Sequence, residues 1–207
     1  MSSRLITERT VREAAISGKE IDLPDEVIVT PAARDLARQL GVPLRRRTTS
    51  PTTELNEQRS EKYRVVLGSD HGGYALKEAL KPVVSRLGFE VTDVGCGSTD
   101  PVDYPVFAAR VADAVARGEA LLGIMIDGAG IGSAMVANKI PGVRAASCYD
   151  LTTAKNAREH NNANVLTLGG GLIGERLAGE IAGVFLMTPF AGGRHAPRVA
   201  MIDALDR

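Results

Sequence analysis

The sequence predicts a doubly wound α/β fold: a five-stranded parallel sheet with helices on both faces, preceded by a small N-terminal helical extension. Apolar runs of strand length alternate with helical patterns from Tyr63 onward. These runs lack the polar alternation of half-exposed strands, which is typical of parallel strands that are covered on both faces. Hydrophobic residues make up 44% of the chain but aromatic residues only 4%, so the core must be aliphatic.

Each element of this Rossmann-like sheet has its own signal along the chain. Apolar runs predict strands at 64–69, 90–95, 121–126, 143–148 and 164–169. Helical patterns lie between and after them, at about 74–87, 105–117, 131–138, 152–159, 172–187 and 197–205. In such a sheet, ligands bind beyond the carboxyl ends of the strands, near the point where the strand order reverses. Chemistry is therefore expected in the residues that follow the strands.

The first 60 residues precede this pattern and predict a separate module. Thr7 can cap a first helix that ends near Ser17, and residues 26–30 can form one short strand. A second helix is expected at 31–40, because a threonine cap precedes it, a proline opens it and a glycine follows it. Two helices and one strand bury little surface, so we expect this module to dock on the main domain, on a neighbouring subunit or on another protein, or to act in targeting.

A polar stretch joins the two parts. Residues 45–63 contain one proline and one aliphatic side chain, and we interpret them as a linker. The arginine run at 45–47 fits a solvated linker, with a phosphate-binding patch as the alternative. The predicted division is therefore an extension with its linker at 1–60 and a main domain at 61–207.

Charge and cysteine content exclude several classes of protein. Lys and Arg number 25, as do Asp and Glu, so no overall field would recruit nucleic acid or an anionic membrane. Cys96 and Cys148 form no CxxC motif, and both are expected to be reduced. The start lacks a signal-peptide pattern, and no apolar run reaches the ~18 residues of a membrane span. A cytoplasmic protein is expected.

Acidic residues follow two of the predicted strands. Asp70 and His71 come after the first strand, and Asp127 follows the third. Successive backbone amides and the start of the next helix would form an anion pocket there. Its residues would be Gly128, Ala129, Gly130, Ile131 and Gly132. The alternative is a tight turn without a ligand, in which Asp127 only caps the helix.

Two further polar segments lie later in the chain. His160 and Asn161 precede the fifth strand. Arg194 and Arg198 lie on either side of His195 near the last helix, and guanidinium pairs suit phosphate because each offers a planar fork of donors. Two solvated surface arginines are the alternative.

The sequence favours chemistry without a cofactor. A G-x-G-x-x-G pattern occurs at 169–174, but too little chain follows it for a further dinucleotide-binding unit. The three histidines are scattered and form no HxxH or HExxH motif. Neither a nucleotide cofactor nor a metal is therefore expected.

Five motifs within residues 63–207 together resemble the ribose-5-phosphate isomerase B and galactose-6-phosphate isomerase family. In chain order they are GSDHGGYALKEAL, DYP, GAGIGSAMVANKIPGVRAA, REHNNANVLTLG and GGRHAPR. The resemblance implies cofactor-free interconversion of an aldose phosphate and a ketose phosphate. The sugar ring opens, a base removes the proton next to the carbonyl, and a cis-enediolate forms.

The resemblance also implies roles for the residues singled out above. His160 matches the ring-opening histidine of the family, and the loop from Gly128 to Gly132 matches its enediolate pocket. The substrate contacts are matched by Asp70, His71, Asn161, Arg194 and Arg198, the two arginines as phosphate ligands. The family implies a homodimer or homotetramer with sites formed between subunits, so that His160 and the arginines can come from different chains.

The pattern departs from the family at its base. Many members carry a cysteine where this chain has Asp127, and another branch carries a glutamate base at the position of Ser133. A threonine common at the position of Ala129 and a substrate-binding arginine common at that of Gly171 are also missing. An aspartate at 127 is similar to the A-type subunit of galactose-6-phosphate isomerase, which works with a B-type subunit.

Two interpretations of Asp127 stay open. In the first it is the base, favoured by burial, which disfavours a charged carboxylate, and opposed by loop amides, which stabilise one. In the second the chain is a non-catalytic partner subunit or a sugar-phosphate binding module. Because His160, both arginines and the glycine loop are retained, we expect an isomerase with Asp127 as base. Its substrate would be ribose 5-phosphate or a related tetrose to hexose phosphate.

Residues 1–60 fall outside this resemblance. They faintly resemble extensions on enzymes that are packaged in bacterial microcompartments. This implies a contact with a shell or with other cargo, and a location inside such a compartment.

Overall fold

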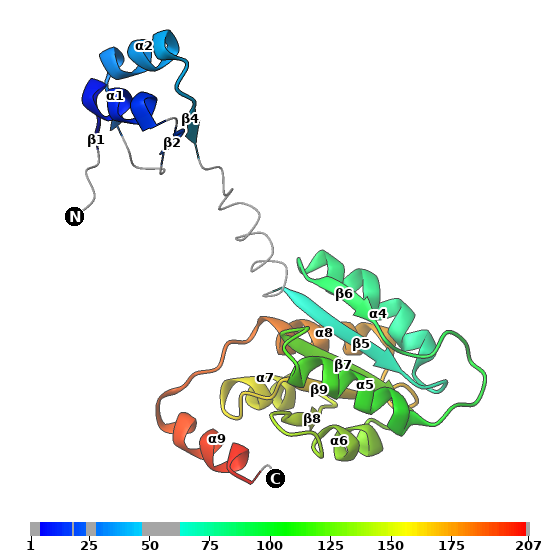
Figure 1. Cartoon of the computed structure of the whole chain (residues 1–207). Coiled ribbons are helices and arrows are strands. Elements are labelled where there is room, and N and C mark those ends of the chain that lie inside the picture. The colour runs from blue at the N-terminus through cyan, green and yellow to red at the C-terminus, as the bar shows by residue number, and fades with distance from the viewer. Residues whose placement is uncertain (1–4, 18, 24–27, 47–62, 206–207) are drawn as a thin grey trace. The chain divides into compact units, whose positions relative to one another are not determined.

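The computed structural model describes residues 5–17, 19–23, 28–46 and 63–205. The chain divides into two compact units, Met1–Glu57 and Gln58–Arg207 (Figure 1). The predicted linker falls largely on residues 47–62, which lie outside the described residues. Within the described part of the chain, no helix is both long enough and apolar enough to span a bilayer.

The N-terminal unit is built from two β-α-β halves. Its elements are β1 (Leu5–Ile6), α1 (Glu8–Ser17), β2 (Ile21–Leu23), β3 (Ile28–Val29), α2 (Pro31–Leu40) and β4 (Leu44–Arg46). The halves pair in parallel, β1 with β3 and β2 with β4. Leu5 pairs with Ile28 and Ile21 with Leu44, so both pairs are 23 residues apart. The unit therefore contains an internal structural repeat.

Both predicted helices of this unit are confirmed. Only one strand was predicted, whereas the described residues of the unit form β1, β2, β3 and β4. Strands of two or three residues carry almost no periodic signal, which explains why β1, β2 and β4 were missed. The unit also has a hydrophobic cluster of its own, made of Ile6, Val11, Ile21, Leu23, Ala33, Ala37 and Val42. That the unit docks on another body stays a prediction.

The main unit contains the predicted five-stranded parallel sheet. The strands are β5 (Arg64–Ser69), β6 (Glu90–Asp93), β7 (Leu122–Asp127), β8 (Ala145–Ser147) and β9 (Val165–Gly169). The helices are α4 (Tyr74–Arg86), α5 (Tyr104–Ala116), α6 (Ile131–Ala137), α7 (Leu151–Glu159), α8 (Glu175–Met187) and α9 (Ala196–Asp203), with a 3₁₀ turn η1 (Gly193–His195) before α9. The predicted fold class is confirmed.

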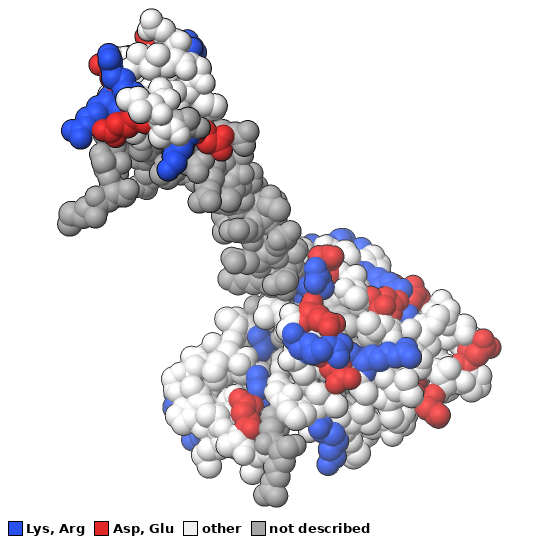
Figure 2. Space-filling model, viewed as in Figure 1, with Lys and Arg blue, Asp and Glu red and all other residues white. Residues whose placement is uncertain are grey.

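Helices cover both faces of this sheet because successive strand residues point to opposite sides. Val65, Leu67, Ile124 and Ile126 pack in a cluster with apolar residues of α4, α7 and α8. Met125 packs in the opposite cluster, with residues of α5 and α6. Positive and negative side chains are interleaved on the face seen in Figure 2, in keeping with the balanced composition.

The strand order is β6-β5-β7-β9-β8, which places the switch point between β5 and β7. The chain leaves β5 for β6 on one side and then crosses to β7 on the other. Asp70 follows β5 directly, whereas Asp127 is the last residue of β7 and not, as predicted, the first residue after it. The fold therefore brings the two predicted acids to the crevice where doubly wound sheets bind ligands.

Candidate functional site

Asp70 lies at the carboxyl edge of the sheet, where its backbone joins two strands. Its N–H donates to Ile126 O at 3.1 Å, and its Oδ1 accepts from Gly73 N at 3.0 Å. The residue is only 6% exposed. The next residue, His71, is exposed, and its Nδ1 lies 3.1 Å from both the N and the O of Val102. One buried acid and one exposed imidazole thus stand side by side at this edge.

The loops after β5, β7 and β9 pack backbone against backbone. Gly170 N donates to Asp127 O at 2.7 Å, and a Cβ added at Gly170 would lie 2.7 Å from Gly72 O. Only glycine permits so close an approach. These contacts hold the Asp70 loop and the Asp127 loop together at the same place.

The Asp127 carboxylate accepts four hydrogen bonds from the loop that follows it. Oδ1 accepts from Ala129 N at 2.8 Å and from Gly130 N. Oδ2 accepts from Ser133 N at 3.0 Å and from Ser133 Oγ at 2.5 Å. Asp127 is 5% exposed and Ser133 is fully buried. The carboxylate therefore fills the amide pocket that the sequence predicted for a ligand anion.

The carbonyl groups of this loop are fixed as firmly as its amides. Gly130 has φ 78°, in the left-handed region that favours glycine. Its O accepts from Thr167 Oγ1 at 2.6 Å and from Ser147 Oγ at 3.2 Å. Tyr149 OH donates to Ala129 O at 2.8 Å. The loop is held from both sides, so its amides point at Asp127 in a preorganised way.

A second cluster forms around His160, at the end of α7. The ring of His160 stacks on that of His195, with centroids 4.2 Å apart and planes 6° from parallel. Arg194 adjoins His195 in η1, and Arg198 follows one turn later in α9; both are exposed. Desolvation, and then the electrostatic influence of His160, Arg194 and Arg198, lower the pKa of His195. The cluster is a cationic surface suited to an anion.

The two clusters lie at opposite edges of the same sheet. Helix α7 begins after β8, at the carboxyl edge, and His160 follows its end, beside the start of β9. A nine-residue helix is about 13 Å long at a rise of 1.5 Å per residue. Arg144 precedes β8 and donates to Asp203 at the end of α9, at 2.7 Å, so α9 also lies at the amino edge (Figure 1).

The predicted residues therefore form two groups within one chain. The carboxyl-edge group contains Asp70, His71, Asp127 and the loop Gly128, Ala129, Gly130, Ile131 and Gly132. The amino-edge group contains His160, Asn161, Arg194 and Arg198. The stack of His160 on His195 joins His160 to the arginines of its own chain. His160 and the two arginines therefore need not come from different chains, as the family resemblance had permitted.

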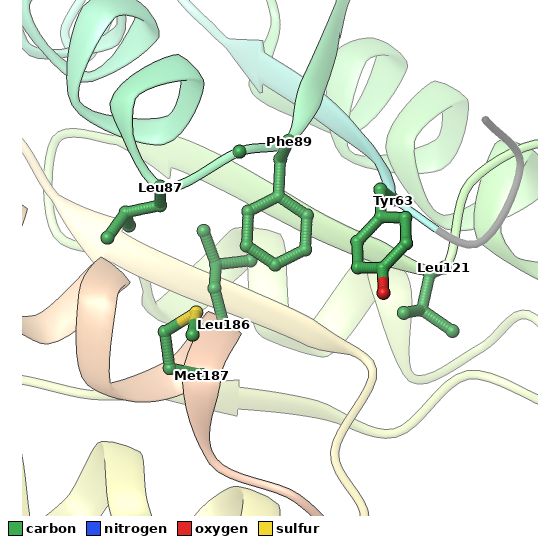
Figure 3. A pocket seen from close by; sticks show the side chains of 7 residues that line it. Tyr63, Leu87, Phe89, Leu121, Leu186 and Met187 are labelled. Carbon is green, nitrogen blue, oxygen red and sulfur yellow. The ribbon is translucent and has the colours of Figure 1, made fainter. Parts of the chain in front are cut away.

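An apolar cavity of the main unit takes no part in either group. It has a volume of about 460 Å³ and is lined by Tyr63, Leu87, Gly88, Phe89, Leu121, Leu186 and Met187 (Figure 3). These residues precede strands or end helices at the amino edge, and none is charged. Among the residues that the structure describes, no group of three or more His, Cys, Asp and Glu side chains could hold a metal ion.

Comparison with known proteins decides the family. The sequence model of the Ribose/Galactose Isomerase family matches residues 65–202. The chain belongs to this family. Ribose-5-phosphate isomerase B from Escherichia coli K12 is 40% identical over 144 residues, which cover 70% of this chain and 97% of that protein. The galactose-6-phosphate isomerase subunit LacA from Streptococcus equi subsp. equi is 43% identical over 141 residues, covering 68% and 98%.

Solved structures of this isomerase family share the fold of the main unit. Ribose-5-phosphate isomerase B from Clostridium thermocellum has a TM-score of 0.67 and 45% sequence identity, and the match covers 69% of this chain and 96% of that one. The resemblance inferred from the five motifs, and with it the class of aldose–ketose isomerase, is confirmed. The N-terminal unit lies outside the matched residues 65–202.

Two residues of this isomerase's clusters were not predicted as site residues. Ser133 was noted only as the position of another branch's base, yet it gives two of the four hydrogen bonds to Asp127. Asn156 was not singled out, although its Nδ2 lies 2.9 Å from His160 Nδ1. The i, i+4 spacing of Asn156 and His160 on one predicted helix was the signal that could have found it.

Proposed function

We propose that the main unit interconverts an aldose phosphate and a ketose phosphate through a cis-enediolate, without a cofactor. The observation that carries this proposal is the acid-and-amide arrangement at the switch point of an isomerase-family fold. Asp127 stands where many family members carry the cysteine base, and preorganised amides surround it. Asp70 and His71 are adjacent and would contact the substrate. Ribose 5-phosphate or a related tetrose to hexose phosphate is the substrate class.

The chemistry requires Asp127 to give up the two hydrogen bonds that its Oδ1 accepts. The Asp127 carboxylate would take the proton from the carbon next to the carbonyl, leaving an enediolate, and return it to the adjacent carbon. The four donors that now bind the carboxylate occupy both of its oxygens, so one oxygen must be freed before it can take a proton. An oxyanion of the substrate that takes over the amides of Ala129 and Gly130 would free Oδ1 and be stabilised in its place. Substrate binding thus activates the base.

The separation of the two clusters supports a site shared by two copies of the chain. The amino-edge group offers the phosphate-binding Arg194 and Arg198 and the ring-opening His160, but it cannot reach Asp127 of the same chain across the sheet. A symmetric homodimer, or a homotetramer made of two such dimers, would place the amino-edge group of one copy against the carboxyl edge of the other. Each dimer would then contain two sites.

The direct test is a panel of phosphorylated aldoses and ketoses in deuterated water, monitored for deuterium on carbon. The proposal expects exchange with at least one phosphosugar and its loss in Asp127→Asn, which keeps the shape but removes the base. Asp35→Asn, the same substitution at an exposed aspartate of α2 in the N-terminal unit, is the matched control. Exchange that is equally fast in Asp127→Asn would rule out Asp127 as the base.

A second candidate function is favoured by the same carboxylate. Asp127 already accepts hydrogen bonds from the amides of Ala129, Gly130 and Ser133. In this second candidate, capping of α6 is its whole role. The chain would then be a non-catalytic partner subunit or sugar-phosphate binding module. This candidate predicts that a phosphosugar raises the melting temperature without any proton exchange. It also predicts that exchange appears when a related chain with cysteine at position 127 is added.

For the N-terminal unit we propose docking to a partner body, such as the shell or cargo of a microcompartment. Its separate hydrophobic cluster allows it to fold without the main unit. Deletion of residues 1–60 should leave proton exchange intact and change only assembly or localisation. Complete loss of exchange on deletion would contradict a pure docking role.

A further inference from the structure

We propose that Asn156 is a positioning residue that fixes the proton of His160 on Nε2, so that this N–H faces the substrate. The inference rests on the proposed isomerisation, in which His160 opens the sugar ring. It concerns a residue that the family motifs leave unassigned, one turn upstream of the histidine on α7.

Asn156 connects the two site residues at the end of α7. Its Nδ2 lies 2.9 Å from His160 Nδ1, and its Oδ1 accepts from Asn161 Nδ2 at 3.3 Å. Its backbone O accepts from His160 N at 3.0 Å, which keeps the two residues in helical register. One amide side chain therefore bridges His160 and Asn161.

The bridge determines which nitrogen of His160 carries the proton. Because Asn161 donates to Oδ1 of Asn156, the amide is oriented with its NH₂ group toward the imidazole. An NH₂ group can only donate, so Nδ1 of His160 must accept and be unprotonated. The neutral ring then carries its proton on Nε2. An N–H on Nδ1 would instead face the NH₂ group, donor against donor.

The ring of His160 is held on two sides. His195 stacks on its face with ring centroids 4.2 Å apart. Asn156 Nδ2 lies 2.9 Å from its Nδ1. The stack and the amide contact together fix the orientation of the ring.

A neutral imidazole with an outward Nε2–H is suited to ring opening. As the bond between the anomeric carbon and the ring oxygen breaks, the ring oxygen takes the Nε2 proton. The anomeric hydroxyl gives its proton to the same nitrogen and becomes the carbonyl, so atoms and charge balance. The opposite tautomer would present a bare Nε2 and could give the ring oxygen no proton.

The test compares a sugar phosphate that cyclises with one that cannot. Ribose 5-phosphate must open its furanose ring, whereas erythrose 4-phosphate cannot form one, because its terminal oxygen carries the phosphate. Asn156→Ala and Asn156→Asp should lower kcat for ribose 5-phosphate about tenfold or more and leave erythrose 4-phosphate unaffected. Thr152→Ala, exposed on the same helix, is the matched control. An equal loss with both sugars, or no loss with ribose 5-phosphate, would overturn the role of Asn156.

A second measurement needs no turnover. In the full chain labelled with ¹⁵N-histidine, single His→Asn substitutions assign the signals of the three histidines. The parent should show His160 with an unprotonated Nδ1, and Asn156→Asp should move the proton to Nδ1, since a carboxylate accepts it. A parent His160 that is protonated on Nδ1 would contradict the inference. If neither sugar is turned over while the tautomer is as expected, the proposed function fails and the positioning by Asn156 stands.

Discussion

The two polar clusters of the main unit are built in opposite ways. At the carboxyl edge, Asp127 and Ser133 are buried and satisfied by the loop that contains them. At the amino edge, Arg194 and Arg198 are exposed and project from the last two helical segments. The first cluster is complete as a structure, whereas the second has charges that still need a partner. Substitutions should therefore cost stability at the carboxyl edge and only binding at the amino edge.

The largest effect on folding is expected for Asp127→Ala. It would leave the amides of Ala129, Gly130 and Ser133 and the Ser133 hydroxyl without their acceptor. Each buried group left unpaired costs about 1–3 kcal/mol. We expect the free energy of unfolding, measured with urea, to fall by about 3 kcal/mol or more. A fall below about 1 kcal/mol would mean that the carboxylate is not held as described.

Arg194→Ala and Arg198→Ala should reverse that pattern. Under the proposed function, each would remove a charge-assisted hydrogen bond to phosphate, worth about 1.5–3 kcal/mol, and should raise KM about 10- to 100-fold. The free energy of unfolding should change by no more than about 0.5 kcal/mol, because both side chains are exposed. Arg86→Ala, an exposed arginine of α4, serves as the control for loss of charge alone. Destabilisation equal to that of Asp127→Ala would remove the contrast between the clusters.

Ser133→Ala separates stability from catalysis at the carboxyl edge. It removes one of the four donors to Asp127 and should cost about 1–2 kcal/mol of unfolding free energy. If Asp127 is the base, loss of this donor leaves Oδ2 with one hydrogen bond instead of two and so more accessible to the substrate proton, and proton exchange should be faster than in the parent. A slower exchange in a folded Ser133→Ala variant would instead favour the helix-capping role of Asp127.

The smallest effect concerns acid stability at the end of β6. Burial opposes ionisation of Asp93, but hydrogen bonds from Lys77 and Lys81 outweigh it and lower the pKa of Asp93. Lys77 is 2% exposed and donates to Asp93 Oδ2 at 2.8 Å. Because the pKa of Asp93 is lower in the folded state, its ionised carboxylate stabilises the fold at pH values above the ordinary pKa of 3.8. This stabilisation is lost as the pH falls through the pKa of the folded state. Asp93→Asn should therefore flatten the fall in stability below about pH 4.

The carboxyl-edge cluster was predictable in place but not in geometry. Asp70 and Asp127 were found because parallel strands end at one edge and ligands bind there. That the amides of Ala129 and Gly130 turn inward onto Asp127 depends on the left-handed conformation of Gly130. A glycine permits that conformation without requiring it, so the sequence left both interpretations of Asp127 open.

At the amino edge the residues were predicted but their grouping was not. The sequence placed His160 before the last strand, yet the His195 stack depends on how the segment after α8 returns to α7. Ala191 N donates to Glu159 O at 3.0 Å and makes that return. Such a long-range contact has no periodic signal. The strands of the N-terminal unit were missed for a related reason, because elements of two or three residues are set by their partners.

The central claim is that the two clusters act together across two copies of the chain. The most direct measurement mixes Asp70→Asn, which disables the carboxyl-edge group, with His160→Ala, which disables the amino-edge group, after dissociation and reassembly. Each variant alone should be inactive. The mixture should regain about a quarter of the parent activity, since half of randomly formed dimers are mixed and each holds one intact site. No recovery from a mixture that does form mixed dimers would contradict the shared site.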